Sequence, residues 1–182
     1  MKGGMNAWNG FVASGPPEFG MAFFDTTADP RELIALAWLL EDGSGRFYAG
    51  VSSFIHDQDA SDLFMNLSGA ENRHMASLVN LYREFTGKDP EAGFRDILTA
   101  DDAKQDVMEG NMNVSEALKW AKGQDKKNIL ELSMALETNS YDLYIKMGRS
   151  FSEEKSRKVF DVLVSEEKSH LDKLADLLEK NL

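Results

Sequence analysis

The sequence has 182 residues, of which 42% are hydrophobic, so it is long enough and apolar enough for one compact domain with a sizeable core. Its 31 acidic residues outnumber 20 basic ones, and the formal charge of -11 disfavours binding to nucleic acid or to an anionic membrane. There is no cysteine, which excludes disulfides and thiolate metal sites, and no apolar run of about 18 residues or apolar signal core. We therefore expect a soluble, cytoplasmic protein.

The first predicted helix begins at Asp29-Pro30, because Asp29 is a good N-cap, proline suits the first helical position and Glu32 stands at N3. We expect a turn over residues 57–62, which are rich in aspartate. A second helix follows, with apolar residues at helical spacing until Thr86-Gly87. These two helices form the first predicted hairpin.

A second hairpin is predicted from about Asp125 to the C-terminus, with a break at residues 150–152. The hairpins are joined by residues 88–124, a connection that contains a short helix opened by the Asn113-x-x-Glu116 capping box. So long a link predicts a crossover rather than a tight turn.

The two hairpins repeat each other at a constant offset. Two Glu-x-x-His motifs, Glu71/His74 and Glu167/His170, lie 96 residues apart. The same offset relates Glu41 to Glu137, Ser44 to Ser140, Tyr48 to Tyr144, Phe64 to Phe160, Leu67 to Leu163, Leu78 to Leu174 and Leu81 to Leu177. We therefore predict an all-α four-helix bundle built from one helical hairpin written twice.

The repeated acids and histidines form the predicted metal site. Both glutamates of a hairpin lie at equal distances from its turn, roughly 20 Å away at 1.5 Å per residue, and residues three apart share a helix face. Four carboxylates would repel each other unless they protonated or met cations, and two divalent ions would balance their charge. Oxygen-rich coordination with one imidazole per metal suits iron or manganese, with iron expected first, while zinc or copper could occupy the same site by affinity alone. The predicted ligands are Glu41, Glu71, His74, Glu137, Glu167 and His170.

Other residues near these motifs have competing interpretations. Glu166 lies four residues before His170 and could share its face, but its repeat counterpart is Ala70, which favours Glu167. His56 has no counterpart and is interpreted as a surface or structural residue. Tyr48 and Tyr144 are either core residues or hydroxyl donors to a ligand carboxylate on a neighbouring helix. Trp38, Phe64 and Phe160 are assigned to the core.

The repeat is broken where Gly45 corresponds to Tyr141. Gly43 and Gly45 should each destabilise a helix by about 1 kcal/mol relative to alanine, so something is expected to compensate. Gly45 either leaves space for a small oxidant or an extra solvent ligand, or allows close helix packing. The alternative for the whole pattern is a degenerate duplication that has lost its metal, leaving an interaction bundle.

These motifs resemble the ferritin-like di-iron superfamily, and most closely its rubrerythrin-type members, over roughly residues 30–180. The resemblance implies a ferritin-like bundle with two Fe ions, in which Glu41 and Glu137 are terminal ligands and Glu71 and Glu167 bridging ones. It implies a non-haem peroxidase or oxidase that reduces hydrogen peroxide, or dioxygen, and a homodimer. The alternative is an iron-storage protein with a ferroxidase centre, which would need a closed shell of many subunits.

Two departures from the rubrerythrin pattern qualify this resemblance. Rubrerythrins carry a further glutamate where this chain has Ser140, which puts their redox-linked iron movement in doubt here. They also typically bear a four-cysteine rubredoxin module, and without cysteine the electrons must come from an external electron-donor protein.

Residues 1–28 are expected to lie outside the bundle domain, which spans residues 29–182. The stretch from Lys2 to Gly10, followed by Gly15-Pro-Pro, resembles the closing segment of a rhodanese domain. The chain would then be, or descend from, the tail of a longer fusion. Sulfur transfer is excluded because the catalytic cysteine of that family is absent.

Overall fold

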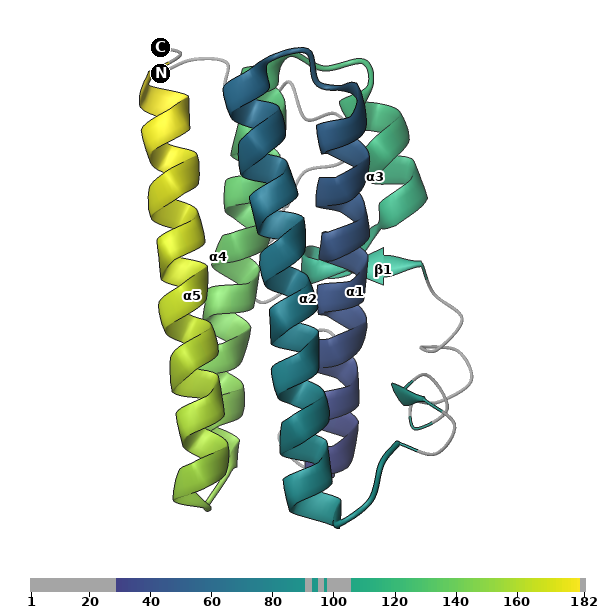
Figure 1. The fold of residues 1–182 in the computed structure, drawn as a ribbon, viewed down its shortest axis with the longest axis vertical. Helices are drawn as coiled ribbons and strands as arrows, with labels where there is room; N and C mark the ends of the chain where they lie inside the picture. Colours follow the sequence, from purple (N-terminus) through teal and green to yellow (C-terminus); the bar gives the residue numbers. More distant parts are fainter. Residues whose placement is uncertain (1–28, 91–92, 95–96, 98–105, 181–182) are drawn as a thin grey trace.

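The computed structural model describes residues 29–90, 93–94, 97 and 106–180, and its long helices form two antiparallel hairpins lying side by side (Figure 1). The first hairpin consists of α1 (Pro30–Phe54) and α2 (Gln58–Thr86), and the second of α4 (Lys126–Ser150) and α5 (Glu154–Glu179). In Figure 1, α2 and α4 both run downward, so the connection between them returns along the length of the bundle. The predicted all-α four-helix bundle with a long crossover is confirmed.

Aspartate N-caps fix where three of these helices begin. The side chains of Asp29, Asp57 and Asp125 accept hydrogen bonds from the backbone N–H groups of Arg31, Ala60 and Asn128, which satisfies donors that the first helical turn leaves free. The turn predicted over residues 57–62 is wrong in its extent. Because Asp57 caps the helix, α2 already begins at Gln58, and the later acids of that run are helical.

The connection contains a small hairpin that the sequence pattern did not predict. Strands β1 (Val107–Met108) and β2 (Met112–Asn113) pair antiparallel around the short 3-10 helix η3 (Glu109–Asn111). Helix α3 (Val114–Ala121) follows, and its N-cap Asn113 accepts from the N–H of Glu116, as the capping box predicts. This hairpin packs against α1 and α4.

Gly43 allows the connection to lie directly against α1. A Cβ atom at Gly43 would stand 2.0 Å from the carbonyl oxygen of Val107, a distance that no real side chain tolerates. The absence of a side chain therefore compensates for the low helix propensity of glycine. Gly43 is buried two residues after Glu41, so the connection passes α1 at the height of that glutamate.

The apolar core is divided by a polar layer. One cluster gathers Leu33 to Leu40 with Leu78, Leu81, Leu143, Phe160 and Leu163, and the other gathers Phe47, Val51, Phe64, Leu67, Leu130, Leu136 and Leu174. Between them lie the buried acids and histidines of the repeat. Phe64 and Phe160 belong to the core as predicted, whereas Trp38 is only partly buried against it.

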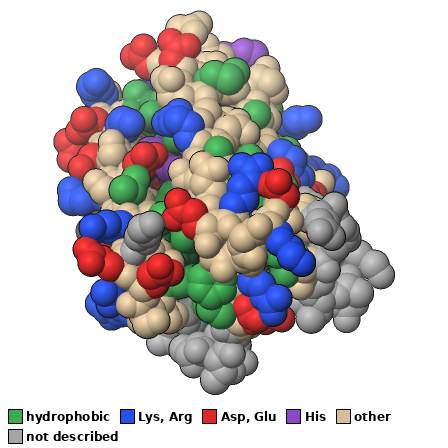
Figure 2. Space-filling model, turned by 60° about the horizontal axis from the view of Figure 1, so that its bottom comes forward, with side chains coloured by type: hydrophobic (Ala, Val, Ile, Leu, Met, Phe, Trp, Pro, Cys, Tyr) green, Lys and Arg blue, Asp and Glu red, His purple; other side chains and the backbone are tan. Residues whose placement is uncertain are grey.

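The outer surface is mixed in charge. On the face shown in Figure 2, lysine and arginine side chains are interspersed with aspartate and glutamate. Within the described residues, no helix is both long and apolar enough to cross a membrane.

Replacing Gly43 with alanine should lower the free energy of unfolding by about 1–3 kcal/mol, because the added methyl group collides with the backbone of β1. Urea denaturation of the metal-free protein measures this change. The matched control is Gly69→Ala in α2, where a Cβ would meet only the Arg73 guanidinium at 3.9 Å. That control should instead be stabilised by up to about 1 kcal/mol. A Gly43→Ala variant as stable as the wild type would contradict the packing role.

Candidate metal centre

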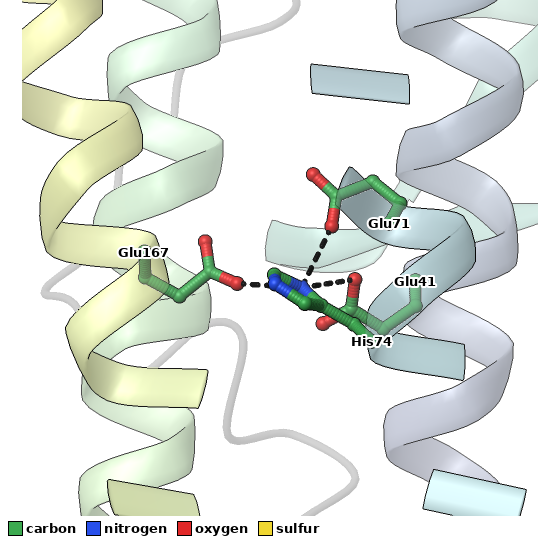
Figure 3. Close-up of side chains that lie close together, drawn as sticks. All are labelled: Glu41, Glu71, His74 and Glu167. Atoms are coloured by element: carbon green, nitrogen blue, oxygen red, sulfur yellow. Dashed lines mark hydrogen bonds and ion pairs between the residues drawn. The ribbon is translucent and has the colours of Figure 1, made fainter. Parts of the chain in front are cut away.

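The six residues predicted from the repeat converge in the polar layer. Glu41 lies on α1, Glu71 and His74 on α2, Glu137 on α4, and Glu167 and His170 on α5, and each is at most 3% exposed. Figure 3 shows Glu41, Glu71, His74 and Glu167 pointing toward one another from three helices. Because the glutamates stand at equal distances from the turns of their hairpins, they meet at one height.

The potential ligand atoms fall into two groups, and within each group the atoms all lie within 4.8 Å of one another. One group consists of Glu41, Glu71, His74 and Glu167, and the other of Glu71, Glu137 and His170. The two histidine rings stack with centroids 5.6 Å apart, so the groups are adjacent and share Glu71.

His74 is surrounded by carboxylates on its Nδ1 side. Nδ1 lies 3.2 Å from Glu41 Oε2, 3.0 Å from Glu71 Oε2 and 3.1 Å from Glu167 Oε1. A ring nitrogen carries at most one hydrogen, so Nδ1 can donate to only one of these three carboxylates, and its contact with Glu41 has hydrogen-bond geometry. Among the residues that the structure describes, Glu71 Oε2 and Glu167 Oε1 are therefore buried without a hydrogen-bond donor.

These unpaired oxygens indicate that the site is built for cations. An ionised carboxylate out of water is destabilised by several kcal/mol unless it is paired and hydrogen-bonded. His74 presents one nitrogen to these carboxylates, and a single N–H cannot donate to three of them. A set of oxygen ligands with two imidazoles and no sulfur fits iron or manganese. The buried cluster therefore fits a metal site.

The close approach of several buried carboxylates shifts the pKa values of the histidines and acids of the site. Burial lowers the pKa of His170, but its hydrogen bonds to Glu137 and Glu167 outweigh burial and raise it to about 10. Burial would also lower the pKa of His74, and the charge of Glu41 with the surrounding carboxylates raises it instead. Burial, followed by the charge of Glu137, raises the pKa of Glu167 to about 8. Without metal, the site therefore stores protons that metal binding must release.

The two repeated tyrosines link the hairpins through the ligands. The hydroxyl of Tyr48 on α1 donates to Glu137 Oε1 on α4, and the hydroxyl of Tyr144 on α4 donates to Glu41 Oε1 on α1. Both tyrosines are buried. The expected hydroxyl contact with a carboxylate on another helix is present in both copies, and each hydroxyl holds one carboxylate oxygen in place.

Glu166 occupies a different place from Glu167. Glu167 faces the cluster, while the side chain of Glu166 is 40% exposed and its Oε2 lies 2.8 Å from His74 Nε2, on the outer side of the ring. The Nε2–H can donate to Glu166, which leaves Nδ1 as the nitrogen that faces the cluster. This contact was not predicted, because Ala70 occupies the equivalent position of the first copy. His56 is exposed and lies outside the site.

The structure also decides between the two interpretations of Gly45. A Cβ atom there would stand 3.3 Å from the Cβ of Glu71, so α1 and α2 pack closely at this point. The hypothesis that Gly45 leaves space for an oxidant is wrong, and close helix packing is the reason for the glycine. At Ser140 the hydroxyl donates to the carbonyl of Leu136 on the same helix, so this position supplies no carboxylate.

One buried acid near the site was missed by the sequence analysis. Glu109 in η3 is 2% exposed, and its Oε2 has no hydrogen-bond partner in the described part of the chain. It lies in the connection and so has no repeat counterpart. The only sequence signal is a glutamate between Met108 and Gly110, which is too common to indicate a site.

Comparisons with known proteins agree with this arrangement. A solved structure of a hypothetical protein from Pyrococcus furiosus is similar to the chain with a TM-score of 0.62 and 20% sequence identity, covering 91% of this chain and 95% of that one. At this identity the likeness shows the fold. None of the curated proteins matches the chain. The Rubrerythrin family model matches residues 32–178, which include all six predicted ligands. The chain therefore belongs to the rubrerythrin family.

Proposed function

We propose that this protein is a di-iron oxidoreductase that reduces hydrogen peroxide with electrons from a separate donor protein. The observation that carries the proposal is the pair of buried, unpaired oxygens, Glu71 Oε2 and Glu167 Oε1, beside two imidazoles. Membership of the rubrerythrin family supports iron as the metal. Glu41, Glu71, His74, Glu137, Glu167 and His170 would hold the ions.

Reduction of hydrogen peroxide to two waters consumes two electrons and two protons. A pair of ferrous ions at this site would supply both electrons together. The donor protein must then restore them, since the chain has no cysteine with which to hold a redox module of the rubredoxin type. Tyr48 and Tyr144 hold Glu137 and Glu41 in fixed orientations, so that the protein groups need little reorganisation during the reaction.

A surface pocket gives a small molecule a route to the site. It has a volume of about 280 Å³ and reaches His74 between α2 and α5. Arg73, Ser77, Lys158 and Glu166 supply its polar lining, and Val159, Val162 and Leu163 the apolar part. The volume lies just below the usual range for ligand sites and is ample for hydrogen peroxide. The two basic side chains near the opening offset the negative charge of the carboxylates within.

The first test is anaerobic loading with ferrous iron, followed by exposure to peroxide or to oxygen. We expect two irons per chain, and oxidation by peroxide much faster than oxidation by oxygen, measured by metal analysis and stopped-flow absorbance. Glu167→Gln should hold fewer ions, because it removes a carboxylate from the cluster. Glu84→Gln is the control, since it removes an exposed carboxylate of α2 that lies outside both ligand groups and should retain both ions.

Two results would contradict the proposal. Fewer than one metal per wild-type chain after loading would overturn the metal site itself. Oxidation by oxygen as fast as by peroxide, together with a closed shell of many subunits in solution, would favour iron storage instead. A dimer in solution agrees with the peroxidase.

Tyr144→Phe tests the orienting role of the tyrosines. Without the hydroxyl, Glu41 Oε1 loses its donor, and we expect the affinity for metal to fall by about tenfold while two ions per chain are still bound at saturation. Competition with a chelator of known affinity measures the change. Tyr141→Phe, a half-buried tyrosine on the same helix, is the control. Equal affinities for the two variants would show that the hydroxyl does not hold the ligand.

A further inference from the structure

Glu109 is a buried acid that the six-residue site does not account for. Its side chain is 2% exposed, and Oε2 has no hydrogen-bond partner within the described residues. An unpaired buried carboxylate oxygen destabilises the folded protein, so a native structure that keeps one needs a reason for it. The reason must lie in what surrounds Glu109.

Two close backbone contacts hold Glu109 at the level of the metal ligands. On one side, Val107 lies against Gly43, two residues after Glu41 on α1. On the other side, Gly110 lies against the side chain of Asn139, two residues after Glu137 on α4. A Cβ at Gly110 would stand 2.9 Å from Asn139 Nδ2. Gly110 has φ 71°, which favours glycine. The connection is therefore fixed between two helices at the residues that flank two ligands.

The charges around Glu109 agree with this placement. Burial raises its pKa first, and the negative charge of Glu71 is the next cause, with smaller contributions from Glu167 and Glu137. Glu109 also adds to the field around the Tyr48 hydroxyl, which is bonded to Glu137. Its carboxylate is therefore close enough to interact electrostatically with the ligands on α2, α4 and α5.

The two groups of ligand atoms are unequal, and Glu109 interacts electrostatically with members of both. The group around His74 contains four residues, whereas the group around His170 contains Glu71, Glu137 and His170. Glu109 belongs to neither group as the side chains stand. A glutamate has three side-chain torsions, so its carboxylate can change position without movement of the backbone.

We propose that Glu109 is a fifth carboxylate of the metal centre, supplied by the connection between the hairpins, and that it coordinates the ion held by Glu71, Glu137 and His170. This inference rests on the metal binding in the proposed function and is independent of the oxidant. A cation gives the unpaired Oε2 the partner it lacks. Because the connection occurs only once in the chain, Glu109 makes the two metal positions different.

The experiment compares the wild type with Glu109→Gln, which keeps the size of the side chain and removes its charge. Each metal-free protein is titrated with Mn²⁺, and the free ion is followed by electron paramagnetic resonance. We expect two ions for the wild type. For Glu109→Gln we expect one ion with unchanged affinity and a second bound at least about tenfold more weakly. Glu116→Gln, an exposed glutamate of α3, is the control and should match the wild type.

The titration separates failure of this inference from failure of the proposed function. If the wild type binds no Mn²⁺ or Fe²⁺, the metal site itself is wrong. If the wild type binds two ions and Glu109→Gln binds both with wild-type affinity, only the role of Glu109 is overturned.

Thermal denaturation of the metal-free proteins provides the check on folding. Because burial favours the neutral form of Glu109, its replacement by the neutral Gln should leave Glu109→Gln about as stable as the wild type without metal. If that variant does not fold, Glu109→Asp is titrated instead, because it keeps the charge and shortens the side chain by one methylene. Glu109→Asp must then weaken the same single ion, and wild-type affinity for both ions would overturn the proposal.

Discussion

The crowding of carboxylates in the middle of an apolar bundle is the constraint on which the rest of the structure depends. Four glutamates are buried around two imidazoles, and one N–H of His74 faces three carboxylate oxygens. Neighbouring carboxylates raise the pKa values of both histidines, and the apolar clusters on either side of the layer supply the packing that offsets its burial. The apolar packing thus offsets the unfavourable burial of the carboxylates, and bound cations would neutralise their charge.

The approximate twofold symmetry of the layer is broken at several positions, each with a local physical cause. Glu166 contacts the outer nitrogen of His74, while no corresponding carboxylate precedes Glu71, because residue 70 is alanine. Gly43 admits the backbone of β1, and the connection brings Glu109 to one side of the layer. The pocket reaches the layer beside His74. The two halves are alike in the ligands they contribute and different in what approaches those ligands.

Most of the bundle and its layer could be predicted because their signals are local or repeated. Aspartate caps and the Asn113 capping box depend on residues within one turn, and the 96-residue offset identifies equivalent positions without any knowledge of the fold. The offset separated Glu167 from Glu166, and the structure places Glu167 in the cluster. It also indicated the tyrosines, whose bonds to carboxylates cross between the hairpins.

The connection could not be predicted for the opposite reason. Strands of two residues carry no periodicity, and the position of Glu109 depends on contacts with Gly43 and Asn139 that are distant in sequence. The wrong interpretation of Gly45 has the same cause. A glycine in the sequence does not show whether the space beside it is open or filled by a neighbouring helix, as it is here. The rhodanese-like segment and the division at residue 28 lie outside the described residues and stay predictions.

Each hairpin supplies a tyrosine hydroxyl to a carboxylate of the other hairpin, and this restricts which mutations the two copies can accept independently. Each copy supplies a ligand and the hydroxyl that orients the ligand of the other copy, so neither hairpin contains a complete half of the centre. A single ancestral hairpin with this pattern would have had to pair with a second molecule to be useful. A substitution at Tyr48 removes the hydroxyl that orients Glu137, and a substitution at Tyr144 removes the one that orients Glu41. The hairpins can therefore diverge on their outer surfaces, in their loops and in their connection, but at the centre they must change together.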